Sequence, residues 1–122
     1  MKITISALIL MAGIFSTSVF AEDCSDAYSY ADDAYTQAKR GYNADNLEYA
    51  QYYARKAMFD TEDAMFAAEG CNCDDAYSAA DDAHTYARRA YLSGDYDDAI
   101  GYLRRAKPSA DDAMSYADDC GT

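Results

Sequence analysis

The chain repeats itself with a period of 49 residues, and this duplication limits its possible folds more than any other feature. Shifting the sequence by 49 positions places Cys24 on Cys73 and Cys71 on Cys120. In the same register, residues 24–34 align with residues 73–83. Self-similarity at a fixed period indicates one structural unit present in two copies. We therefore expect a single domain over residues 22–122, built of two repeats at 24–71 and 73–120.

Alanine recurs at steps of three and four, which predicts two helices in each repeat. In the first repeat four alanines share one helix face, namely Ala27, Ala31, Ala34 and Ala38. A polar turn at 43–46 follows, and a second series with the same rhythm runs from 47 to 68. Helices joined by a short turn lie antiparallel, so each repeat is predicted to be a helical hairpin. The expected fold class is all-α, with two tandem hairpins forming either a small four-helix bundle or a two-unit solenoid.

Two features mark the expected limits of the second helix in each repeat. Asp45 with Glu48, and Asp95 with Asp98, have the spacing of helix N-termini, where carboxylates accept hydrogen bonds from free amides. Proline removes a helical hydrogen bond and clashes with the preceding turn. We therefore expect a kink or short break near Pro108, with a milder counterpart near residue 60, and a three-helix unit is the alternative.

The first 21 residues have the pattern of a secretory signal. Lys2 precedes an apolar stretch, and the small side chains of Val19 and Ala21 suit a cleavage site. A permanent membrane helix is the less favoured interpretation because serine and threonine interrupt the stretch. No later apolar run approaches the roughly 20 residues that a membrane span requires. We expect a periplasmic or secreted protein without a stable membrane span after cleavage.

Four cysteines remain in the exported part of the chain: Cys24, Cys71, Cys73 and Cys120. An even number of cysteines in an exported protein favours disulfide bonds. Antiparallel hairpins bring the two ends of each repeat together, so we favour pairing within each repeat. Pairing between equivalent cysteines of the two repeats also stays open. A zinc site is the competing interpretation, but the paired CxxC pattern is missing, and we predict no metal and no cofactor.

The net charge of −12 restricts the classes of partner. Removal of the signal also removes Lys2 and leaves a charge of −13. Such a charge disfavours nucleic acids and anionic membranes and favours basic proteins. Carboxylate pairs such as Asp32–Asp33 support the alternative of a calcium-binding protein, although no segment has the pattern of an EF-hand loop.

One helix carries an aromatic stripe that its copy lacks. The stripe consists of Tyr49, Tyr52, Phe59 and Phe66, and these four residues align with Asp98, Gly101, Pro108 and Ser115. They lie opposite the alanine face, so the helix is apolar nearly all round and its outer face has to be covered. We favour coverage by the other hairpin over coverage by a partner. The stripe is nevertheless the best candidate interaction site.

Other tyrosines follow the alanine faces at seven-residue intervals. The series Tyr28, Tyr35 and Tyr42 aligns with Tyr77, His84 and Tyr91. Bulky rings beside an alanine seam are expected to fill the space that alanine leaves, and His84 is expected to be a substituted packing residue. No nucleophile motif accompanies this histidine, and we predict no catalytic residues.

The segment with Ala87, Gly94–Ile100, Leu103 and Ala106 resembles the second half of a tetratricopeptide repeat. The resemblance covers about twenty residues and implies a helical hairpin, but the 49-residue period is longer than that family's. No binding residues carry over from it. From all these features we expect a non-enzymatic binding protein, acting as an immunity-type or inhibitor-type partner of a basic protein. The oligomeric state does not follow from the sequence.

Overall fold

The computed structural model describes residues 23–120, which form four α-helices without a strand in this range. The helices are α2 (Ser25–Tyr42), α3 (Leu47–Gly70), α4 (Asp74–Leu92) and α5 (Tyr96–Cys120). The all-α prediction and the two helical hairpins are thereby confirmed. The predicted signal segment 1–21 lies outside the described residues.

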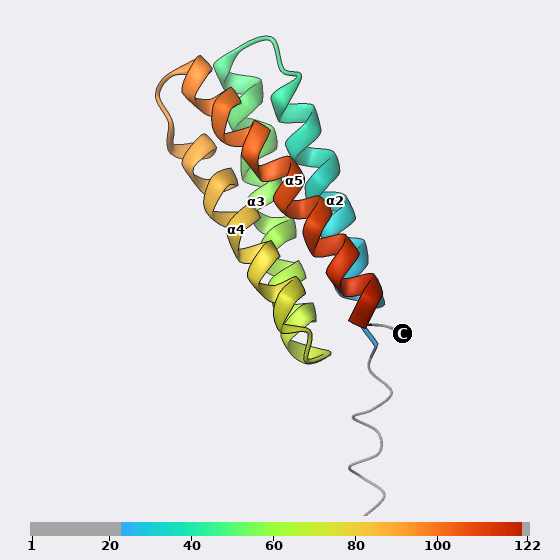
Figure 1. Cartoon of the computed structure of the whole chain (residues 1–122). Coiled ribbons are helices and arrows are strands. Elements are labelled where there is room, and N and C mark those ends of the chain that lie inside the picture. Colours follow the sequence, from blue (N-terminus) through green and yellow to red (C-terminus); the bar gives the residue numbers. More distant parts are fainter. Residues whose placement is uncertain (1–22, 121–122) are drawn as a thin grey trace, which may run out of the picture.

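The four helices close into an antiparallel bundle. Each helix packs against two neighbours, in the pairs α2–α3, α3–α4, α4–α5 and α2–α5, and the diagonal pairs hardly meet. Figure 1 shows both hairpin turns at one end of the bundle and the α3–α4 junction with the end of α5 at the other. We call these the turn end and the cysteine end. Because α2 packs against α5, the architecture is a closed four-helix bundle rather than an open solenoid.

The interior of the bundle consists almost entirely of alanine. The buried exceptions are Cys24, Gly41, Thr61, Cys73 and Leu103. Small side chains allow helix axes to approach to about 8 Å. They also bury little apolar area, so the hydrophobic contribution per residue is small. The fold therefore depends on further stabilisation.

Two disulfide bonds at the cysteine end supply that stabilisation. They join Cys24 to Cys71 and Cys73 to Cys120, each across 47 residues. The prediction of pairing within each repeat is confirmed. Between the two cystines lies Asn72, whose φ of 57° is in the left-handed region that asparagine tolerates better than most residues. This conformation helps to reverse the chain between α3 and α4 within the three residues 71–73.

The helix N-termini at the turn end differ in part from the prediction. Asn46, and not Asp45, caps α3, since its Oδ1 accepts a 2.9 Å hydrogen bond from the amide of Tyr49. Asp95 caps α5 as predicted and accepts a 3.0 Å hydrogen bond from the amide of Asp98. Asparagine and aspartate are equally favoured as N-cap residues, so the adjacent Asp45 and Asn46 could not be told apart from the sequence.

Helix α5 continues through Pro108, so a break at this point and the three-helix unit are wrong, while the kink stays a prediction. Pro108 and Arg104, whose carbonyl loses its helical donor, are both exposed, and solvent can therefore satisfy that carbonyl. The hydroxyl of Ser109 donates to the carbonyl of Arg105 at 3.3 Å, within the same turn. Helix α3 is equally continuous at Asp60.

Candidate interaction surface

The aromatic stripe on α3 is exposed, and the other hairpin does not cover it. The exposed fractions are 57% for Tyr49, 51% for Tyr52, 50% for Phe59 and 70% for Phe66. Helix α3 meets α2 and α4 through its alanine face, and the bundle closes without using the opposite face. The expectation of internal packing was therefore wrong. The stripe is an apolar surface facing solvent on one side of the bundle.

Two basic side chains lie against this stripe. The guanidinium of Arg55 lies 5.3 Å from the ring centre of Phe59, and the ammonium of Lys56 lies 5.2 Å from that of Tyr52. The rings of Tyr52 and Tyr53 meet edge to face at 5.0 Å. Exposed cation–π contacts are worth about 0.5–1 kcal/mol each, which favours one arrangement of these side chains. The middle of the stripe is thus both aromatic and positively charged.

Charge is segregated along the bundle. The nine Lys and Arg residues of the described chain all lie in the segments 39–56 and 88–107, which flank the two turns and contain five acidic residues. The rest of the described chain has sixteen Asp and Glu residues and neither Lys nor Arg. The turn half therefore has a net charge of +4 and the cysteine half a net charge of −16. The net charge of the whole chain does not reveal this uneven distribution of charge.

An acidic groove lies where the stripe enters the cysteine half. Glu62, Met65, Phe66 and Glu69 of α3, together with Tyr77 of α4, line a volume of about 400 Å³. The lining combines aromatic and aliphatic side chains with two carboxylates. A lysine or arginine side chain has a complementary form, with an apolar stem and a charged tip.

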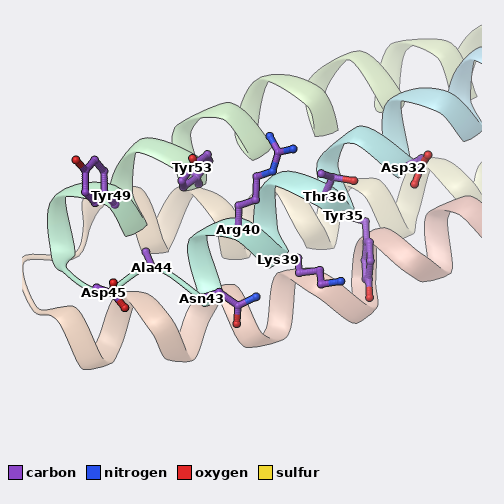
Figure 2. A pocket seen from close by; sticks show the side chains of 10 residues that line it. All are labelled: Asp32, Tyr35, Thr36, Lys39, Arg40, Asn43, Ala44, Asp45, Tyr49 and Tyr53. Atoms are coloured by element: carbon purple, nitrogen blue, oxygen red, sulfur yellow. The ribbon is translucent and has the colours of Figure 1, made fainter.

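A second cleft lies between α2 and α3 at the turn end. It measures about 680 Å³ and contains Tyr49 and Tyr53 of α3 with Lys39 and Arg40 of α2. In Figure 2 the two tyrosines project from α3, and Arg40 extends from α2 toward that helix. Tyr49 belongs to both the stripe and this cleft. The stripe thus borders this cleft at one end, where Lys39 and Arg40 are balanced by Asp32 and Asp45, and the acidic groove at the other end.

His84 links α4 to α3 by hydrogen bonding. Its Nδ1 lies 3.1 Å from the hydroxyl oxygen of Thr61 and 3.2 Å from the carbonyl oxygen of Met58. The carbonyl can only accept, so that bond requires the proton on Nδ1. The hydroxyl of Thr61 lies 2.9 Å from the carbonyl of Ala57 and can donate to it. His84 is half-buried, which agrees with a packing role, but the sequence had not indicated its hydrogen bonds.

Asp60 has a strongly raised pKa. Burial raises the pKa of Asp60 to about 6, and the negative charges of Asp33 and Asp63 add to the shift. The positive charge of Lys56 acts in the opposite direction. Asp60 lies at the boundary between the basic and acidic halves.

Within the described residues, the one group of three potential metal ligands consists of cysteine sulfurs. The Sγ atoms of Cys24, Cys73 and Cys120 lie within 4.8 Å of one another, but they belong to the two disulfides. Within residues 23–120, no group of three carboxylates has the same proximity. Calcium binding stays a prediction, and melting with and without calcium is its test.

The structure brings the predicted interaction residues together on one helix face, with neighbours that the sequence reasoning missed. The missed residues are Arg55, Lys56, Glu62, Met65 and Glu69. Except for Met65, which is adjacent to Phe66, they are spaced three or four residues from Phe59 or Phe66, and this spacing could have identified them in the sequence.

The chain matches no protein-family model, and no curated protein or solved structure shows significant similarity to it. No helix within residues 23–120 combines the length and the apolar character required to cross a bilayer. The function therefore has to be inferred from the surface.

Proposed function

We propose that this protein is an exported, non-enzymatic interaction protein that binds a basic protein partner at the cysteine half of α3. The observation that carries the proposal is the acidic groove around Phe66, the most exposed ring of the stripe. Export to the periplasm or the exterior is supported by the signal-like start of the chain and by the two disulfide bonds. An inhibitor-type or immunity-type role agrees with a small, acidic protein of this kind.

The groove offers two contributions to binding. Phe66 and Met65 provide apolar contact for the aliphatic part of a lysine or arginine, and aromatic anchors often dominate interface energies. Glu62 and Glu69 provide charge. The surrounding half has sixteen acidic residues without a compensating lysine or arginine, so a basic partner is attracted from a distance.

The proposal can be tested with a synthetic helical peptide made of lysine and leucine residues. Its binding to the oxidised protein is measured by calorimetry at low and physiological salt. We expect the double variant Glu62→Gln/Glu69→Gln to bind at least several-fold more weakly than the natural protein. The matched control is Asp111→Asn/Asp112→Asn on α5, which changes the charge equally at exposed positions away from the groove.

Equal weakening by the two double variants would mean that only net charge matters, and the groove would lose its role. The variant Phe59→Ser/Phe66→Ser adds a separate readout. We expect its circular dichroism to stay helical, because both rings are exposed, while binding of the peptide is lost. Loss of folding would instead assign these rings to the stability of the bundle.

A further inference from the structure

The outer face of α3 is symmetric about its middle residue. Tyr52, Phe59 and Phe66 are spaced by seven residues, and Phe59 lies at the centre of the helix that runs from Leu47 to Gly70. All three rings are at least half exposed. At 100° per residue, this spacing keeps them within a narrow outward stripe.

Charged residues surround Phe59 in an antisymmetric pattern. Arg55 and Lys56 precede it by four and three residues, and Glu62 and Asp63 follow it by three and four. The helical angles place Lys56 and Asp63 on one flank of the stripe and Arg55 and Glu62 on the other. Each flank is therefore positive on one side of Phe59 and negative on the other.

We propose that this face binds a second copy of the same chain, with the two α3 helices antiparallel and a two-fold axis at Phe59. Such an axis reverses the helix direction and keeps each flank on its own side. Lys56 then faces Asp63 of the second copy, and Arg55 faces Glu62 of the second copy. Tyr52 packs against Phe66 of the second copy, and the two Phe59 rings meet at the axis.

A parallel arrangement is disfavoured because it would place like charges opposite each other on both flanks. The antiparallel arrangement also suits the whole molecule. It sets the turn half of one copy, with its net charge of +4, beside the cysteine half of the other, with its net charge of −16. This alignment reduces the repulsion that two acidic chains would otherwise experience.

The inference does not depend on the proposed basic partner. Both use Phe66 and Glu62, so a dimer and a basic partner would compete for one surface. The face of a single helix is a small interface, and a weak, concentration-dependent dimer is expected.

Charge reversal provides the central test, followed by sedimentation velocity of the oxidised protein over a concentration range from about 10 μM to 1 mM, which suits a weak interface. We expect the natural protein to dimerise and Lys56→Glu to weaken the dimer at least tenfold. The double variant Lys56→Glu/Asp63→Lys keeps the natural net charge and the natural number of charged residues, and it should restore dimerisation. Arg88→Glu, an exposed change of equal charge on α4, is the control and should weaken the dimer by less than threefold.

A cross-linking experiment tests the position of the axis. Phe59→Cys is expected to form a covalent dimer on mild oxidation, because the axis brings residue 59 of each copy together. Phe66→Cys should not do so, because the two copies of residue 66 would be about 21 Å apart along the helices, at a rise of 1.5 Å per residue. A monomeric natural protein at 1 mM, failure of the double variant to restore the dimer, or equal cross-linking of both cysteine variants would overturn the proposal.

Discussion

Gly41 leaves the space that the side chain of Leu103 fills, so the effects of substitutions at these two positions should depend on each other. A methyl group at Gly41 would lie 2.9 Å from Cδ1 of Leu103, 3.2 Å from Cβ of Tyr53 and 3.3 Å from the carbonyl oxygen of Ala50. The repeat places Gly41 at the position of Ala90, and Leu103 at the position of Ala54. One hairpin thus has glycine and the other leucine where their copies have two alanines.

The structure indicates whether each substitution raises or lowers the free energy of unfolding, and by how much. Gly41→Ala gains about 1 kcal/mol of helix propensity and loses about 1–3 kcal/mol to overpacking, so a net destabilisation of about 1 kcal/mol is expected. Leu103→Ala removes a fully buried side chain and should destabilise the protein by about 2–5 kcal/mol. In the Leu103→Ala background the clash with Cδ1 is absent, and the methyl group at residue 41 fills part of the cavity. The emptied volume lets Tyr53 and Ala50 give by the few tenths of an ångström that their contacts of 3.2 and 3.3 Å require. There, Gly41→Ala should stabilise the protein by about 1 kcal/mol.

The assay is urea unfolding of the four proteins followed by circular dichroism, with both disulfides intact. The deciding quantity is the sign of the Gly41→Ala effect in the two backgrounds. If Gly41→Ala lowers the free energy of unfolding equally in both, the two positions are independent and the volume argument fails.

Three further predictions concern other parts of the bundle. Gly101→Ala should raise the free energy of unfolding by about 0.5–1 kcal/mol, because its methyl group meets nothing within 4 Å in a helix interior; a loss in urea unfolding would contradict this. Reduction should lower the melting temperature sharply or abolish folding, because closure of a 47-residue loop by each disulfide stabilises the fold by about 4 kcal/mol. An unchanged melting curve in reductant would refute the dependence on disulfides. Stability should fall as pH rises from about 4 to 6, because the pKa of Asp60 is raised to about 6 and the folded state holds a proton that the unfolded state releases. Asp60→Asn should flatten this trend in unfolding measured across the pH range, and an unaltered slope would assign the trend to other carboxylates.

The duplication and the alanine rhythm were sufficient to predict the hairpins, because these depend on local periodicity and on antiparallel geometry. They favoured the observed disulfide pairing but left pairing between equivalent cysteines of the two repeats open. The choice between bundle and solenoid was not accessible, since it depends on whether α2 meets α5. For the same reason the exposure of Phe59 and Phe66 could not be predicted. A helix that is apolar on both faces does not reveal which face its neighbours use.

Pro108 shows where a local rule gives way to its surroundings. A proline inside a helix is most costly when the carbonyl that it frees is buried. Here the freed carbonyl belongs to exposed Arg104, so water can satisfy it and the helix continues. The charge segregation, in contrast, was readable from the sequence, but it becomes a property of the molecule only once the helices are antiparallel.

The meeting of the first and last described helices at the cysteine end has a consequence for chain connectivity. The sulfurs of Cys24 and Cys120 lie within 4.8 Å of each other, so a short peptide could join the end of α5 to the start of α2. A new opening in the exposed turn at 43–46 would then give a circular permutant, with the helices in the order α3, α4, α5, α2. Every neighbouring pair and both cystines would be retained. What defines this fold is the cyclic order of four helices, and the point at which the backbone enters the cycle is interchangeable.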